Sequence, residues 1–152
     1  MTARLDAVRN PSHDYLFHCK TVGYGHLPEG DLTATARQNL GKWGESLAAD
    51  YLMQRGYMLV ERNARTPYGE LDLVMRQGEG LVFVEVKTRA SRAYGLPEES
   101  ITPRKQEHLL NAARAYLQNH TELSGDWRVD VIAIRRIQGF PPEVVHFENV
   151  LH

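Results

Sequence analysis

The sequence has a single cysteine, Cys19, and almost no net charge. One cysteine excludes an internal disulfide and a cysteine-based zinc site, and it fits a reducing, cytoplasmic setting. Because 18 Lys and Arg stand against 19 Asp and Glu, the formal net charge of -1 argues against a polybasic nucleic-acid binder, although it leaves room for a local basic patch. No run approaches the roughly 20 apolar residues that span a bilayer, and the N-terminus lacks the apolar core of a secretory signal. We therefore expect no membrane segment.

What the sequence does contain is the composition of an ordinary globular domain. Its 152 residues are 42% hydrophobic and 24% charged, which is enough to bury a core. Residues 1–34 scatter proline, glycine and histidine without a helical or strand period, and this predicts an irregular N-terminal extension. Regular patterns begin after that point, so we expect one domain over residues 35–152.

The order of helical and strand patterns indicates the fold class. Apolar residues recur with a helical period for about 20 residues from Thr35, and Gly56 is a typical residue to end that helix. The pattern then predicts strands at 57–63, 70–76 and 81–88, a helix that begins at Thr102-Pro103, a strand at 127–136 and a short final strand at 144–147. The two strands around 77–80 form a hairpin. This order predicts an α/β fold with an α-β-β-β-α-β core, a mixed central sheet flanked by helices, and a short extra C-terminal strand.

Charged residues interrupt the apolar strands at three positions. Glu85 and Lys87 are two residues apart in a strand, so both side chains point to the same face. Asp72 stands between Leu71 and Leu73, where a buried strand favours apolar atoms. Burying such charges is costly unless they are paired or bind a metal ion.

The two predicted helices each add polar residues to this set. Glu45 lies at the margin of the apolar arc of the first helix, from which it can reach the sheet edge. Lys105 and Gln106 lie in or near the apolar arc of the second helix, in its first turn. Two carboxylates, water and a substrate phosphate oxygen suit Mg²⁺, so metal-assisted phosphodiester hydrolysis is one interpretation. The alternative is that Lys87 simply neutralises Glu85 within the core.

Two further groups of charged residues leave alternatives open. Asp130 either marks the site or pairs with Arg128 or Arg136, and we favour the structural pairing. The basic residues that surround the predicted site either contact phosphates or form solvated surface; they include Arg65, Arg89, Arg92 and Lys105.

Four motifs carry a resemblance to a known family. They are GKWGESLAADYL at 41–52, RNARTPYGELDLV at 62–74, FVEVKTR at 83–89 and YGLPEESITPRKQ at 94–106. In this order they resemble the YraN family of small bacterial proteins, over about residues 36–150. That family is similar to a branch of the PD-(D/E)xK nuclease superfamily, whose restriction-endonuclease-like core has the same α-β-β-β-α-β order, and Holliday-junction resolvases of that superfamily are its functional analogues.

The resemblance implies roles for individual residues. Asp72 and Glu85 would bind the metal ion, Mg²⁺ or Mn²⁺, Lys87 would be the catalytic lysine, and Glu45 the acid on the helix. Gln106, or Lys105 beside it, would be an auxiliary polar residue. Because resolvases act on two-fold symmetric junctions as dimers, a homodimer is one implied assembly, although no segment is identified as its interface.

Three functions follow as competing hypotheses. The first is a metal-dependent nuclease that acts on DNA, including branched or single-stranded forms, in DNA processing or repair. The second is a catalytically weak nuclease-fold module that binds nucleic acid. The third is a structural adaptor in which Glu85 and Lys87 form a core ion pair.

Overall fold

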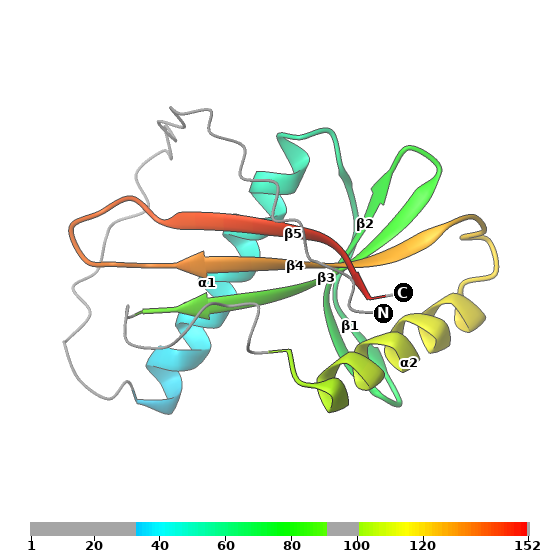
Figure 1. Cartoon of the computed structure of the whole chain (residues 1–152), viewed down its shortest axis with the longest axis horizontal. Coiled ribbons are helices and arrows are strands. Elements are labelled where there is room, and N and C mark those ends of the chain that lie inside the picture. The colour runs from blue at the N-terminus through cyan, green and yellow to red at the C-terminus, as the bar shows by residue number, and fades with distance from the viewer. Residues whose placement is uncertain (1–32, 91–100, 152) are drawn as a thin grey trace, which may run out of the picture. The chain divides into compact units, whose positions relative to one another are not determined.

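A computed structural model describes residues 33–90 and 101–151 of the chain (Figure 1). The predicted extension over residues 1–34 therefore lies outside the described residues, apart from its last two positions. Arg92 also lies outside them. No helix in the described part is long and apolar enough to cross a membrane.

The elements follow the order that the sequence predicts. They are α1 (Ala34–Met53), β1 (Met58–Thr66), β2 (Gly69–Gln77), β3 (Gly80–Arg89), α2 (Pro103–Asn119), β4 (Trp127–Arg135) and β5 (Glu143–Leu151). The five strands form one sheet in the order β1-β2-β3-β4-β5. Neighbouring strands are antiparallel except β3 and β4, which are parallel and are joined through α2. The α/β class and the mixed sheet flanked by helices are confirmed.

Local residue chemistry sets the ends of both helices. The Thr33 hydroxyl accepts a hydrogen bond from the Ala36 amide at 3.2 Å, which caps the start of α1. Beyond the end of α1, Gly56 has φ +88°, a left-handed conformation that glycine adopts without strain. Thr102 caps α2 through the Lys105 amide at 3.3 Å, and Pro103 occupies its first turn as predicted.

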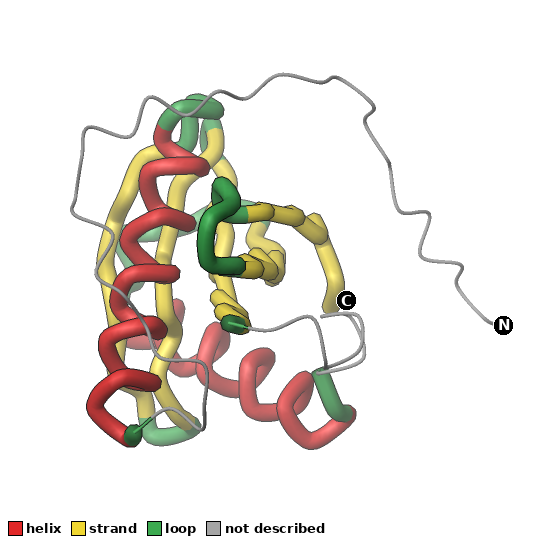
Figure 2. Tube along the Cα trace, turned by 90° about the vertical axis from the view of Figure 1, so that its left-hand side faces the viewer, coloured by secondary structure: helices red, strands yellow, loops and turns green. Residues whose placement is uncertain are grey.

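The two helices pack on opposite faces of the sheet. Leu81 and Phe83 of β3 belong to the buried cluster that α2 covers. Thr88 of the same strand lies against Gly44 of α1. Odd and even positions of a strand point to opposite faces, so α1 and α2 cover different sides of β3. Figure 2 shows both helices (red) against the strand layer (yellow).

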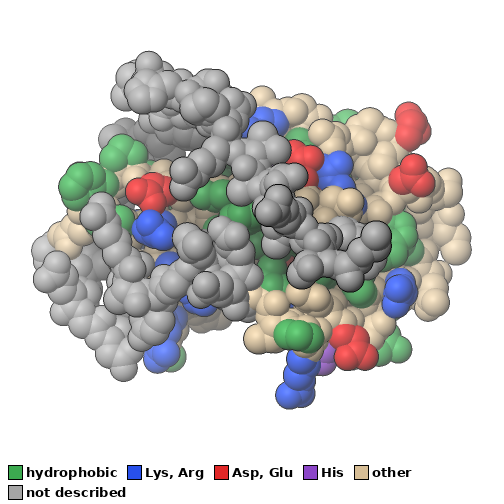
Figure 3. Space-filling model, viewed as in Figure 1, with side chains coloured by type: hydrophobic (Ala, Val, Ile, Leu, Met, Phe, Trp, Pro, Cys, Tyr) green, Lys and Arg blue, Asp and Glu red, His purple; other side chains and the backbone are tan. Residues whose placement is uncertain are grey.

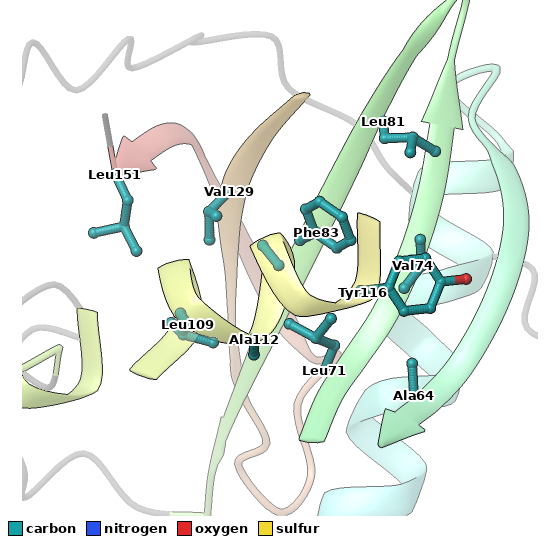
Figure 4. Close-up of a cluster of buried hydrophobic side chains, with 11 residues drawn as sticks. Ala64, Leu71, Val74, Leu81, Phe83, Leu109, Ala112, Tyr116, Val129 and Leu151 are labelled. Carbon is teal, nitrogen blue, oxygen red and sulfur yellow. The ribbon is translucent and has the colours of Figure 1, made fainter. Parts of the chain in front are cut away.

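The core beneath α2 is centred on Phe83, which is fully buried. Its ring meets the ring of Tyr116 edge-to-face, with the centroids 5.7 Å apart. Figure 4 shows these side chains with Leu109, Ala112 and Leu71 between α2 and the sheet. The Tyr116 hydroxyl donates a hydrogen bond to Glu61 on β1 at 2.7 Å, which fixes α2 against the edge of the sheet. This core holds α2 in place with its first turn beside β3, where Lys105 contacts Glu85.

The predicted final strand is present and extends beyond residues 144–147 at both ends. The strand β5 runs over Glu143–Leu151 and is as long as β4, with nine residues in each. Polar Glu148 and Asn149 end the apolar alternation, which is why the sequence pattern predicts an earlier end. Asn149 takes φ +51° and its amide donates to a carboxylate oxygen of Asp130 at 2.8 Å, so the strand continues beyond this irregularity.

Candidate functional site

The candidate site lies where β2 and β3 separate. Their pairing runs from Gln77 opposite Gly80 to Leu73 opposite Val84 and is not continued further within the described residues. Immediately beyond it, the Val86 amide donates to Asp72 Oδ2 at 2.7 Å. A side-chain carboxylate thus takes the place of a backbone acceptor in the sheet. This hydrogen bond fixes the Asp72 carboxylate beside the residue that follows Glu85.

Glu85 is buried beside two ammonium groups. Its side chain is 5% exposed, and its Oε1 atom lies 2.9 Å from Lys87 Nζ and 3.0 Å from Lys105 Nζ. The other oxygen, Oε2, is buried and has no hydrogen-bond partner among the described residues. A buried carboxylate oxygen without a partner is costly, so this atom is a natural ligand for a cation.

The electrostatics of the site are most visible at Asp72. Burial and the neighbouring negative charge of Glu85 raise the pKa of Asp72 from its ordinary value of 3.8 to about 7. The Val86 amide opposes this rise, and so does the charge of Lys105, whereas the charge of Glu45 adds to it. Both other predicted acids therefore act electrostatically on Asp72, and together with burial they favour its protonated form.

Glu45 reaches this place from α1 through Asn63 of β1. The Asn63 side-chain amide donates to Glu45 Oε2 at 2.9 Å. Asn63 lies between Arg62 and Ala64, which pair with Leu73 and Leu71, so it lies opposite Asp72. It takes φ +50°, and asparagine tolerates this left-handed conformation better than most residues. The sequence pattern assigned no role to Asn63, which it placed at the end of the first strand, whereas β1 continues to Thr66.

A close helix–sheet contact sets the position of Glu45. A Cβ atom at Gly44 would overlap Thr88 Oγ1 and would lie 3.0 Å from Thr88 Cβ. Only glycine therefore lets α1 approach β3 this closely. Glu45 is the next residue, so the same contact brings its carboxylate toward Asn63 and the gap between β2 and β3.

Gly44→Ala is expected to destabilise the fold by about 1–3 kcal/mol, because the added methyl group is forced into Thr88. Gly41→Ala is the matched control in the same helix, because a Cβ there meets nothing within 4 Å. It should stabilise the protein by about 0.5–1 kcal/mol through helix propensity. Urea unfolding of both variants measures the difference. Equal stabilities of the two variants would contradict the close contact at Gly44.

The remaining predicted residues lie in different surroundings. Lys105, and not Gln106, contacts Glu85, since the Gln106 amide donates to the Ile101 carbonyl at 3.3 Å. Arg65 is exposed on β1, and Arg89 is exposed at the end of β3. Arg92 lies outside the described residues. The centre of the site is therefore formed by Asp72, Glu85, Lys87, Lys105 and Glu45.

Asp130 belongs to a separate buried network. It is fully buried on β4 and accepts hydrogen bonds from Arg128 Nε at 2.9 Å and from His146 Nε2 at 2.8 Å. Burial alone would raise the pKa of Asp130, but the hydrogen bonds from His146, Arg128 and the Asn149 amide lower it below its ordinary value of 3.8. The expected structural pairing with Arg128 is confirmed, and His146 is a partner that sequence spacing did not indicate.

The donor set at the site suits a hard divalent cation. Within the described residues, no group of three or more His, Cys, Asp and Glu side chains is placed to hold a metal ion. Asp72 and Glu85 nevertheless offer two carboxylates, and Glu85 Oε2 has no other partner in the described part of the chain. Mg²⁺ commonly takes one or two carboxylates and completes its shell with water and substrate phosphate oxygens. The residues present therefore fit such an ion.

Fold and site together define the class of protein: a mixed α/β sheet with an acid–lysine centre where two strands separate. The chain belongs to the uncharacterised protein family UPF0102, whose model matches residues 44–134. This is the family that the sequence motifs resemble. A UPF0102 protein of Dehalococcoides mccartyi is 44% identical over 105 residues, which cover 69% of this chain and 87% of the relative. One of Syntrophotalea carbinolica is 47% identical over 111 residues, which cover 73% of this chain and 89% of the relative.

Among solved structures, the chain is similar to SfsA of Pyrococcus furiosus, described in complex with Ca²⁺. The match has a TM-score of 0.35 and 15% sequence identity, and it covers 76% of this chain and 65% of that chain. A likeness of this size supports no conclusion about function.

Proposed function

We propose that this protein is a Mg²⁺- or Mn²⁺-dependent nuclease that hydrolyses phosphodiester bonds in DNA. The observation that carries the proposal is the pair of carboxylates, Asp72 and Glu85, held close together between two strands and beside two lysines. The raised pKa of Asp72 and the unpartnered Glu85 Oε2 both favour a cation between them. Perturbed carboxyl groups of this kind are typical of functional sites.

Each residue has a distinct task in this proposal. Asp72 and Glu85 would hold the ion, and the Val86 amide fixes the Asp72 carboxylate through its Oδ2 atom. The bound ion would lower the pKa of a coordinated water and offset the charge of the phosphodiester. Lys87, which is 24% exposed at its side chain, can orient that water or stabilise the charge of the transition state. Glu45 adds negative charge at the same place through its bond with Asn63.

Basic residues outside the centre support nucleic acid as the substrate. Arg65 and Arg89 are exposed on β1 and β3, the strands on either side of β2, which carries Asp72. Arginine side chains in such positions contact phosphates and orient the strand without reading its sequence. Lys105 is 38% exposed at its side chain and can move from Glu85 to a substrate phosphate once an ion neutralises Glu85.

The experiment is a panel of labelled single-stranded, duplex, flap and four-way-junction DNA, incubated with Mg²⁺, Mn²⁺ or EDTA. We expect products with at least one metal–substrate pair, none with EDTA, and a loss of about a thousandfold or more in Glu85→Gln and Lys87→Ala. Glu70→Gln is the matched control, since Glu70 is an exposed acid of the same strand as Asp72. Products that persist in both site variants would contradict the assigned roles.

The runner-up is a nuclease-fold module that binds nucleic acid without cleaving it. One observation favours it. The ammonium groups of Lys87 and Lys105 both contact the same carboxylate oxygen of Glu85, so the negative charge of Glu85 is already offset without a metal ion. Salt-sensitive DNA binding with no products across the whole panel would support this function. A structural adaptor would show neither binding nor products, and apolar replacement of Glu85 and Lys87 would leave its stability equal or higher.

A further inference from the structure

A second feature flanks the contact between α1 and β3, on the side away from Glu45. Successive residues of a helix are 100° apart, so Trp43 and Glu45 project to opposite sides of Gly44. Glu45 is bonded to Asn63 of β1. The Trp43 ring instead lies under the guanidinium of Arg136, whose carbon is 4.8 Å from the ring centroid. Arg136 follows β4, so Trp43 faces the β4 side of the sheet.

The end of β3 connects this pair to the candidate site. The Arg136 amide donates to the Arg89 carbonyl at 2.8 Å, which places the two arginines next to each other. Arg89 comes two residues after Lys87 on the same strand, and Thr88 between them carries the contact with Gly44. Lys87 and Arg89 point to the side of β3 that α2 covers, whereas Trp43 and Arg136 lie on the side that α1 covers. A nucleic-acid strand would therefore pass around the end of β3 at Arg89 to contact both.

The two arginines at the end of β3 and after β4, Arg89 and Arg136, have no acidic partner and make no ion pair with another described residue. By contrast, the adjacent Arg135 is paired with Glu143 at 3.2 Å. Figure 3 shows blue Lys and Arg side chains, with acidic side chains (red) among them, at the left of this face, where β3 and β4 end in Figure 1. Unpaired guanidinium groups beside an aromatic face are suited to a chain of phosphates and bases.

We infer that Trp43 and Arg136 bind an unpaired base of single-stranded DNA next to the cleaved bond. The base stacks on the half-buried Trp43 indole, and the Arg136 guanidinium turns from the ring to the adjacent phosphate. The inference rests on the proposed function for its place beside the site, and it narrows the substrate to DNA with unpaired nucleotides.

A single strand fits this surface better than a duplex. Every base offers a flat face for stacking, and in a single strand that face is available to an aromatic side chain. In a duplex the same faces are already stacked on neighbouring base pairs, and exposing one costs a few kcal/mol. Stacking on an aromatic ring does not depend on which base is present, so the expected preference is for unpaired structure and not for sequence.

Tryptophan fluorescence tests the contact directly. The chain has two tryptophans. The ring of Trp127 packs in the core, with its centroid 5.9 Å from that of Phe83. The variant Trp127→Phe therefore leaves Trp43 as the only fluorescent tryptophan. In EDTA, which prevents cleavage, a 12-nucleotide oligo-dT should quench this emission in a saturable manner. A blunt duplex of equal length should quench it about tenfold more weakly. Saturable binding without quenching, equal quenching by both, or no binding at all would overturn the inference.

Variants of the full chain separate the stacking from the charge. Trp43→Leu should weaken oligo-dT binding about 5- to 150-fold, the range for one stacked base, whereas Trp43→Phe should restore most of the affinity. Arg136→Ala should reduce the slope of log affinity against log salt by about 0.7, the value for one phosphate contact to a single strand. Arg135→Ala is the matched control, because that arginine is held by Glu143. Loss of affinity in Trp43→Leu and Trp43→Phe alike would contradict stacking.

Failure of this inference differs from failure of the proposed function. If Trp43 is quenched by oligo-dT but no metal yields products, the binding surface holds and the nuclease proposal fails. If DNA is cleaved and Trp43→Leu cleaves single strands as well as the parent does, the nuclease proposal holds and the surface fails.

Discussion

Asp72→Asn is expected to abolish cleavage and, in the same molecule, to raise the free energy of unfolding at neutral pH. The folded-state pKa of Asp72 is about 7, above its ordinary value of 3.8. Between these values the folded protein binds a proton that the unfolded chain has released, so stability falls as the pH rises from about 4 to about 7. Above pH 7 the fold carries the full cost of an ionised Asp72.

Asparagine removes this cost and keeps an oxygen that can accept the Val86 amide. At pH 7.5 in EDTA, urea unfolding of Asp72→Asn should therefore give a free energy of unfolding roughly 1–3 kcal/mol above that of the parent. The difference should shrink as the pH is lowered toward 4. Glu70→Gln, an exposed change on the same strand, should show neither effect. If Asp72→Asn is less stable than the parent at pH 7.5, the claim that ionised Asp72 destabilises the fold is contradicted.

Asp130→Ala is expected to have the opposite effect on stability, with a loss of about 3–5 kcal/mol. The carboxylate is fully buried, and its removal leaves the guanidinium of Arg128 and the Asn149 amide without their acceptor. Because the free energy of unfolding of a domain of this size is only about 5–15 kcal/mol, such a variant is expected to be partly unfolded at 37 °C.

The stability that the Asp130 network contributes depends on pH in the opposite direction to that of Asp72. The folded-state pKa of Asp130 is below 3.8, so its stabilisation is present above about pH 4 and is lost as the pH falls through the folded value. Glu148→Ala is the control, since Glu148 is 60% exposed at its side chain and lies 3.5 Å from Arg128. It should cost less than about 1 kcal/mol. Thermal unfolding followed by circular dichroism measures both variants, and a mild effect of Asp130→Ala would contradict the network.

The order of elements could be predicted because local chemistry marks their ends. Gly56 follows the end of α1 in a left-handed conformation, Gly78 and Glu79 form the turn between β2 and β3, and Thr102 caps α2. The alternation of Leu81, Phe83 and Glu85 on one face of β3 also places Glu85 on the side that α2 covers. These features depend on residues close together in the chain, so the sequence alone reveals them.

The contacts that complete the site depend on long-range geometry. Whether Lys105 or Gln106 meets Glu85 depends on the rotation of α2, which the packing of Tyr116 on Phe83 sets. The bond between Asn63 and Glu45 needs both the left-handed backbone at Asn63 and the close approach at Gly44. No local pattern encodes such combinations.

The same limit applies to the far end of the sheet. His146 meets Asp130 across 16 residues of chain, through the pairing of β5 with β4. The polar residues Glu148 and Asn149 conceal the end of this strand in the sequence, although the Asn149 amide donates a hydrogen bond to Asp130. At this irregular end of the strand, a backbone amide bonds to a side chain and the alternation of apolar and polar residues stops. A sequence pattern therefore cannot detect it.

Titration of the Asp72 carboxyl by NMR, with and without Mg²⁺, tests most directly whether Asp72 and Glu85 form a metal centre. Without the ion, the carboxyl should titrate near pH 7. The resonance of Asp72 is assigned as the one that is absent from the spectrum of Asp72→Asn. With saturating Mg²⁺ the midpoint should fall by several units, because the ion favours the ionised form. Glu85→Gln should remove this response. A midpoint near 7 that Mg²⁺ leaves unchanged would contradict the metal centre and, with it, the proposed chemistry.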